Sequence, residues 1–143
     1  MEPVLKRVLR STMSQGLLLS DDLIFTSRVT GTARALGLTV KAARSAEAVL
    51  ALARQEAPAC VVLDLHNPGL DLAVLLGRLA EVCPTRPRVV AYGSHVETAV
   101  LKAARAAGCD IVLPRSRFVE ELSDSLPAWF APLRPQEADR TSG

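Results

Sequence analysis

Cysteine and aromatic residues are scarce in this chain of 143 residues, which has one Trp, one Tyr and three Phe. The three cysteines, Cys60, Cys83 and Cys109, lie far apart and form no Cys-x-x-Cys pair. An odd and dispersed set of cysteines argues against a disulfide framework and against a zinc site. We therefore expect three buried thiols in a reducing compartment.

The chain also has no large excess of charge of either sign. The 17 basic and 15 acidic residues are interspersed and give a formal net charge of +2, without a basic block. This balance argues against nucleic acid and against a membrane surface as partners. No apolar run approaches the roughly 20 residues that span a bilayer, and charged residues within residues 1–10 do not resemble a secretory signal. We expect a cytoplasmic protein.

What the chain does have is apolar bulk, because 49% of its residues are hydrophobic, and its length suits one domain with a substantial core. Short apolar runs recur along it, at residues 16–19, 38–40, 60–63, 88–92 and 111–113. Continuous runs of this length predict strands buried on both faces, as in a parallel sheet.

Amphipathic segments separate these runs and predict helices over residues 23–36, 45–54, 71–82, 94–107 and 116–126. Ser45 is expected to cap the second helix, Ser94 and Glu97 match a capping box, and Pro127 is expected to limit the last helix. Strands that alternate with helices predict a doubly wound α/β fold with right-handed crossovers. We expect a domain over residues 16–130, with an N-terminal extension (residues 1–15) and a flexible C-terminal tail (residues 131–143).

Acidic residues follow two of the predicted strands. Asp21 and Asp22 come after the first strand, and Asp64 comes directly after the third. Ligands of open parallel sheets bind beyond the carboxyl ends of the strands, so these carboxylates would converge if the two strands are neighbours. Clustered carboxylates repel unless a hard cation or a basic side chain neutralises them, and Mg²⁺ is a cation that suits oxygen ligands.

The order and spacing of these residues resemble a response-regulator receiver domain. The acceptor loop of receivers has an Asp, a Pro four positions later and often an Asp seven positions later, and Asp64, Pro68 and Asp71 match all three. Residues 103–110 also resemble the approach to the fifth strand of a receiver. The resemblance implies a flavodoxin-like α/β fold with a doubly wound sheet of five parallel strands in the order 2-1-3-4-5.

The resemblance also implies roles for individual residues. Asp64 would be the phospho-acceptor, and Asp21 and the backbone carbonyl of His66 would be Mg²⁺ ligands. Receivers carry a pair of acids after the first strand, and the pair here is either Ser20 and Asp21 or, after a slip of one residue, Asp21 and Asp22. In the first alignment Ser20 replaces an acidic ligand, so only weak Mg²⁺ binding is expected.

Several positions depart from the receiver pattern. Gly93 stands where receivers have Thr or Ser, with Ser94 next to it, and Val112 stands at the aromatic switch position. Arg115 replaces the Lys at the end of the fifth strand. Because a guanidinium is always charged and bidentate, Arg115 is expected to hold Asp64 in a standing pair.

Other function classes fit less well. Residues 64–69 spell the Asp-x-His-x-x-Gly pattern of cobalamin-binding domains, but they follow the third strand and contain a Pro, and no Gly-Gly pair occurs in the chain. There is no Gly-x-Gly-x-x-Gly after the first strand and no nucleophile elbow, so we expect no enzyme.

Two hypotheses remain. The favoured one is an atypical stand-alone receiver that acts in signal transduction through protein–protein interaction, with weak or no phosphorylation. The alternative is a response regulator that accepts phosphate on Asp64 from a histidine kinase with Mg²⁺. The partner would be a signalling protein or a histidine kinase, and the chain would be a monomer or a homodimer. Residues 95–107 and 115–126 would supply the partner face, where Phe118 either contacts a partner or packs into the core.

Overall fold

A computed structural model describes residues 15–133, which form one five-stranded parallel sheet with helices between the strands. The strands follow one another in space in the order β2-β1-β3-β4-β5, which confirms the doubly wound fold and the strand order expected from the sequence. The elements are β1 (Gly16–Leu19), α2 (Leu23–Ala35), β2 (Val40–Ala43), α3 (Ala46–Gln55), β3 (Cys60–Asp64), α4 (Leu72–Val82), β4 (Arg88–Gly93), α5 (Thr98–Ala107), β5 (Ile111–Pro114) and α6 (Arg115–Trp129). Most of the expected extension and most of the expected tail lie outside the described residues.

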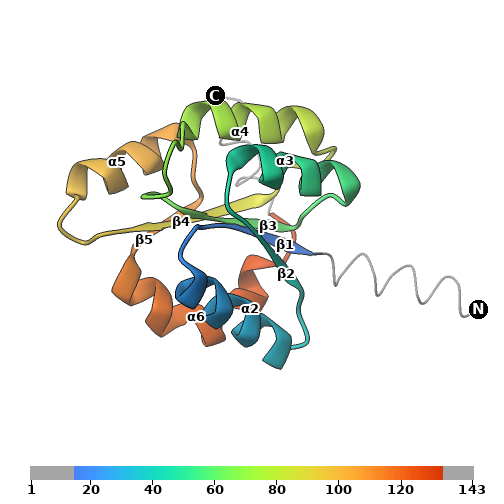
Figure 1. Cartoon of the computed structure of the whole chain (residues 1–143), viewed down its shortest axis with the longest axis horizontal. Coiled ribbons are helices and arrows are strands. Elements are labelled where there is room, and N and C mark those ends of the chain that lie inside the picture. Colours follow the sequence, from blue (N-terminus) through green and yellow to red (C-terminus); the bar gives the residue numbers. More distant parts are fainter. Residues whose placement is uncertain (1–14, 134–143) are drawn as a thin grey trace, which may run out of the picture.

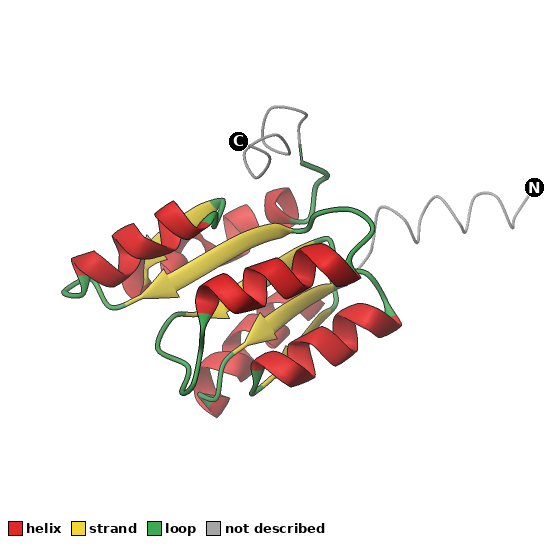
Figure 2. Cartoon of the chain, turned by 90° about the horizontal axis from the view of Figure 1, so that it is seen from above, coloured by secondary structure: helices red, strands yellow, loops and turns green. Residues whose placement is uncertain are grey.

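The helices cover both faces of the sheet. Helices α3, α4 and α5 lie on one face and α2 and α6 on the other (Figure 1). Seen from above, helices lie over and run along the strands (Figure 2). The sheet is therefore the middle of three layers, and both of its faces must be apolar. None of the helices within residues 15–133 is long and apolar enough to cross a membrane.

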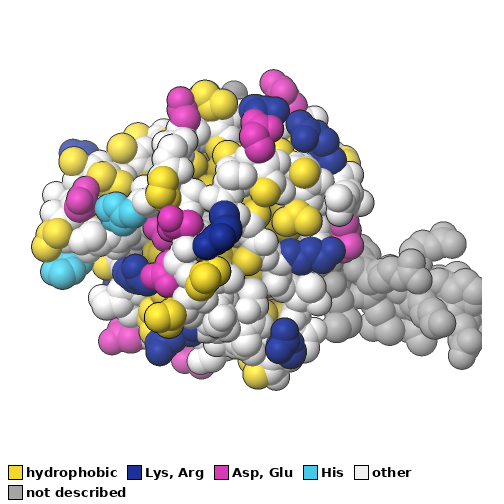
Figure 3. Space-filling model, viewed as in Figure 1, with side chains coloured by type: hydrophobic (Ala, Val, Ile, Leu, Met, Phe, Trp, Pro, Cys, Tyr) yellow, Lys and Arg dark blue, Asp and Glu magenta, His cyan; other side chains and the backbone are white. Residues whose placement is uncertain are grey.

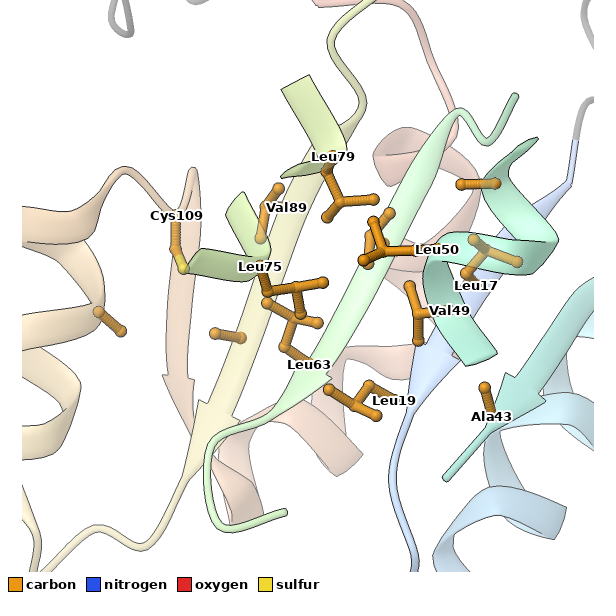
Figure 4. Close-up of a cluster of buried hydrophobic side chains, with 14 of the residues drawn as sticks. Leu17, Leu19, Ala43, Val49, Leu50, Leu63, Leu75, Leu79, Val89 and Cys109 are labelled. Carbon is orange, nitrogen blue, oxygen red and sulfur yellow. The ribbon is translucent and has the colours of Figure 1, made fainter. Parts of the chain in front are cut away.

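Alternation along the strands divides the core into two clusters. Leu17 and Leu19 of β1 point toward α3 and α4, whereas Leu18 between them points toward α2 and α6. Figure 4 shows the first cluster, in which aliphatic side chains of the strands meet those of α3 and α4. The second cluster contains all five aromatic residues of the chain: Phe25, Tyr92, Phe118, Trp129 and Phe130.

The three cysteines are free and buried, as expected. Burial raises the pKa of the Cys60 thiol to about 12 and, together with the charge of Asp110, that of Cys109 to about 11. At neutral pH these sulfurs are therefore protonated, apolar members of the core.

Two predicted helix boundaries are wrong. Helix α5 begins at Thr98 after the N-cap Glu97, whose side chain makes no capping bond, so Ser94 does not open the helix. Instead the Ser94 hydroxyl accepts a hydrogen bond from the Val96 amide at 3.4 Å within the preceding turn. At the other end, α6 continues through Pro127 to Trp129 because Leu126 and Trp129 are buried on the sheet and hold the last turn in place. Strand β2 also lies later than expected, at Val40–Ala43, whereas the Ser45 cap of α3 is confirmed by a bond from the Ala48 amide.

The end of α6 closes over the beginning of β1. Phe130, the C-cap of α6, is buried, and a Cβ atom added to Gly16 would lie 2.7 Å from its Cζ atom. This approach is too close for any other residue without movement of the ring. Glycine at position 16 therefore lets the aromatic ring seat directly on the first strand.

Candidate functional site

Three adjacent strands bring polar residues to one end of the sheet. Leu19 pairs with Leu63, so Ser20 follows β1 beside Asp64 at the end of β3, and Asp64 pairs with Tyr92 of β4. Since side chains alternate along a strand, Ser20, Asp64 and Tyr92 all belong to the face that α2 and α6 cover. The sheet therefore places a hydroxyl, a carboxyl and a phenol side by side.

Asp64 is the centre of this group. Its side chain is buried, its Oδ2 accepts a hydrogen bond from the Ser20 hydroxyl at 3.1 Å, and its Oδ1 accepts one from the His66 amide at 2.9 Å. The second bond closes a turn of the backbone after the strand, a common role of Asp. Both carboxylate oxygens are thus held by groups of the protein itself.

Arg115 pairs with Asp22, which differs from the expected pair with Asp64. Its Nη2 lies 2.7 Å from Asp22 Oδ2, and its Cζ lies 4.5 Å from the centre of the Phe25 ring. The other oxygen of Asp22 accepts the Phe25 amide at 3.0 Å and caps α2. The guanidinium therefore finds a charged partner and an aromatic face together at the start of α2, rather than the buried Asp64.

The charges of this pair stabilise each other. The hydrogen bond from the Phe25 amide, followed by that from Arg115, lowers the pKa of Asp22 below its ordinary value of 3.8. The bond to Asp22 raises the pKa of Arg115. The pair stays ionised at neutral pH and is partly exposed to water.

The expected metal ligands lie at or after the ends of β1 and β3, and two of them already have partners within the protein. Asp21 is exposed, Asp22 caps α2 and binds Arg115, and the oxygens of Asp64 accept bonds from Ser20 and His66. Among residues 15–133 no set of three or more His, Cys, Asp or Glu side chains is placed to hold a metal ion.

The imidazole of His66 covers the end of β4. Its Nε2 accepts a hydrogen bond from the Ser94 amide at 3.0 Å, and a Cβ atom added to Gly93 would lie 3.3 Å from the same nitrogen. The His66 side chain thus stands next to Gly93, the position that the expected alignment with receivers gives to a Thr or Ser. The sequence pointed only to the backbone carbonyl of His66, because nothing in it indicated that the ring would turn toward β4.

An open cavity of about 660 Å³ adjoins this end of the sheet and is lined by His66, Ser94, His95, Arg115, Ser116 and Val119. Figure 3 shows both histidines on one side of this face, where acidic, basic and hydrophobic side chains are mixed rather than gathered by kind. Val112, at the aromatic switch position, is a buried aliphatic residue of β5. Phe118 is fully buried, so it packs into the core, while Arg117 is exposed and pairs with Glu121.

Sequence reasoning missed Tyr92. Its side chain is 1% exposed, and its ring lies 4.6 Å from Phe25 and 4.7 Å from Phe118 between centroids. Burial raises the pKa of its hydroxyl, the neighbouring Ser20 side chain opposes this shift, and the negative charge of Asp64 adds to it. A signal was present, since the only tyrosine of the chain stands inside an otherwise aliphatic strand.

Comparison with known proteins gives matches among solved structures only. No protein-family model and no curated protein matches the chain. NtrX from Brucella abortus in complex with ATP is 22% identical with a TM-score of 0.71, over 82% of this chain and 27% of that one. The chain thus spans about a quarter of the NtrX chain that it matches.

Two further structures match over most of the chain. A CheY-like response regulator receiver domain protein from Methanospirillum hungatei is 16% identical with a TM-score of 0.70, over 92% of this chain and 99% of that one. A response regulator from Burkholderia pseudomallei with a phosphorylated aspartic acid, a calcium ion and citrate is 20% identical with a TM-score of 0.65, over 90% and 71%. With its sheet order and these likenesses, the chain has the fold of a response-regulator receiver domain.

Proposed function

We propose that the protein is an atypical receiver that acts in signal transduction through protein–protein interaction, with little or no phosphorylation of Asp64. The observation that carries this proposal is the state of Asp64. Its carboxylate is buried and held by Ser20 and by the His66 amide, while the neighbouring cation Arg115 is bound to Asp22.

Each departure from the receiver pattern removes one part of a phosphorylation site. Ser20 gives a hydrogen bond to Asp64 where an acid would give a negative ligand to a metal ion. Gly93 supplies no hydroxyl for a phosphoryl oxygen, and the His66 ring stands beside it. Arg115 pairs with Asp22, so its charge is partly neutralised before any phosphoryl group arrives. Together these changes favour a fixed surface over a phosphorylation switch.

The alternative is a phosphorylatable response regulator whose partner is a histidine kinase. It is supported by the place of Asp64 at the end of the third strand, in a loop with the Pro and Asp spacing of receivers. The Burkholderia pseudomallei response regulator with this fold carries a phosphorylated aspartic acid. In both hypotheses the output passes to a signalling protein, and only the first works without phosphate.

Intact-mass measurement after incubation with acetyl phosphate and Mg²⁺ separates the two hypotheses. Wild type and Asp64→Asn should give the same mass, without a phosphoryl adduct. A variant with the receiver residues restored, Ser20→Asp with Gly93→Thr and Arg115→Lys, should gain an adduct and so shows that the assay works. An adduct on the wild type that Asp64→Asn abolishes would replace the first hypothesis with the second.

A further inference from the structure

The hydroxyl of Tyr92 is a buried polar group whose role the fold alone does not explain. Within the described residues the Tyr92 Oη atom has no hydrogen-bond partner, although Ser20 and Asp64 are the side chains beside it. Leaving a buried hydroxyl unpaired costs free energy, because its bonds to water are lost without replacement. A phenylalanine at this position would avoid that cost.

Packing gives no reason for the hydroxyl. The Tyr92 ring lies in the cluster of Phe25 and Phe118, neither of which has a polar side-chain atom. The ring alone therefore supplies what the core requires at this position. The reason for the hydroxyl must therefore lie with its polar neighbours, which are Ser20 after β1 and Asp64 at the end of β3.

Asp64 is the better acceptor of the two neighbours. The Ser20 Oγ atom already donates to Asp64 and accepts from the Asp22 amide. Each oxygen of the Asp64 carboxylate, by contrast, accepts one bond and has room for a second. A charged acceptor also binds a donor more strongly than a neutral one does. Asp64 and Tyr92 are directly paired in the β3–β4 register, so their side chains leave the sheet side by side on the same face.

We propose that Tyr92 is the positioning residue of Asp64: its hydroxyl donates a hydrogen bond to the Asp64 carboxylate. The carboxylate then has three donors, namely the Ser20 hydroxyl, the His66 amide and the Tyr92 phenol. Three donors withdraw charge from the oxygens and make them weak nucleophiles toward a phosphodonor. The inference rests on the proposed function and assigns to Tyr92 the contact with Asp64 that Arg115 does not make.

Carbon-13 NMR of the full chain with labelled aspartate tests this contact at one fixed neutral pH. Tyr92→Phe keeps the ring and removes only the hydroxyl, so it should shift the carboxylate resonance of Asp64 while the fold and the thermal midpoint are retained. Arg115→Gln is the matched control and should shift that resonance less, because Arg115 is bound to Asp22 and acts on Asp64 only through its charge. An Asp64 resonance that does not move in Tyr92→Phe, or that moves more in Arg115→Gln, overturns the inference.

A second measurement uses the fact that the chain has one tyrosine. Tyrosine labelled at Cζ gives a single resonance that reports whether the hydroxyl is a donor to a carboxylate. We expect this resonance to differ between wild type and Asp64→Leu, and identical positions in the two proteins would contradict the contact. This measurement does not depend on how Tyr92→Phe behaves.

Phosphoryl uptake from acetyl phosphate then tests the effect of the contact. Losing one hydrogen bond to a charged group should make Tyr92→Phe accept phosphate about tenfold faster than wild type. Equal uptake would overturn the inhibitory role of Tyr92. Substantial uptake by the wild type would instead contradict the proposed function, while the NMR comparison would still decide whether Tyr92 binds Asp64.

Discussion

Arg115 and Asp22 join the beginnings of two helices on the same face of the sheet. Asp22 is the N-cap of α2 and Arg115 is the first residue of α6, and their side chains meet at 2.7 Å. The guanidinium also lies over the ring of Phe25, which is buried in the core beneath. One ion pair thus connects a surface charge, a helix cap and the aromatic cluster.

The stability of the protein should therefore depend on pH through Asp22. Its pKa is lowered in the folded state below the ordinary value of 3.8, so the folded protein binds fewer protons than the unfolded chain. This contribution to stability is present above pH 3.8 and is lost as the pH falls through the lower, folded pKa. Asp22→Asn keeps a capping side chain without the charge, and its urea midpoint should fall less on acidification. Asp21→Asn, on an exposed neighbour, serves as the control, and parallel acid profiles of wild type and Asp22→Asn would contradict the prediction.

Adding a methyl group at position 93 should release the His66 ring. In Gly93→Ala the new Cβ would lie 3.3 Å from His66 Nε2, so the imidazole must move and the Ser94 amide should lose its acceptor. We expect a shift and faster hydrogen exchange of the Ser94 amide in NMR spectra. His66→Ala should produce the same change at Ser94. An unaltered Ser94 amide in Gly93→Ala would show that the ring does not depend on the glycine.

Magnesium should bind weakly, with a dissociation constant in the millimolar range or above, because Asp64 already accepts bonds from Ser20 and His66 and Asp22 is bound to Arg115. Ser20→Asp adds a negative oxygen ligand beside Asp64 and should tighten binding about tenfold, since affinity for a hard cation follows the charge of its ligands. Ser20→Asn, of similar shape but neutral, should not. NMR titration at neutral pH measures all three proteins, and tight binding by the wild type would show that other groups complete a site.

Phe118 should behave as a core residue. It is fully buried, with ring centroids 4.7 Å from Tyr92 and 5.5 Å from Trp129. Phe118→Ala should lower the free energy of unfolding by about 3–5 kcal/mol, as truncation of a buried aromatic ring does. Arg117→Ala, on the exposed side of the same helix, should change it by less than about 1 kcal/mol. Urea denaturation compares them, and a small loss in Phe118→Ala would favour a role for that residue at an interface.

The fold could be predicted because its signals repeat along the chain. Short apolar runs bounded by polar segments are what a sheet buried on both faces requires, and β1, β3, β4 and β5 lie where such runs stand. The β2 strand was placed early because Leu38 looks like part of it, although Leu38 lies only at the edge of the core and pairing begins at Val40. The predicted helix ends were wrong at Ser94 and Pro127, where the local sequence indicated one boundary and packing in the folded protein produced another.

The site was predictable in position but not in its contacts. The order of elements placed Ser20 next to Asp64, and the structure shows them hydrogen-bonded. The partner of Arg115 could not be read from spacing, because Asp22 and Asp64 both lie at or after the ends of strands on the same side of the sheet, and the choice of Asp22 goes with the contact of Arg115 with Phe25. The orientation of His66 and the depth of Tyr92 depend equally on neighbours that are remote in sequence.

The packing of Phe130 against Gly16 brings the two ends of the described chain together. Gly16 begins β1, whereas Asp64 ends the neighbouring parallel strand β3. The two residues therefore lie at opposite ends of the strands. Because Phe130 lies against Gly16, the first and last elements of the described chain meet at the end of the sheet that is remote from Asp64. A fluorophore or an affinity handle joined at residue 15 or at residue 131 would therefore stand away from Asp64, and a short linker between these points would allow a circularly permuted form of residues 15–131.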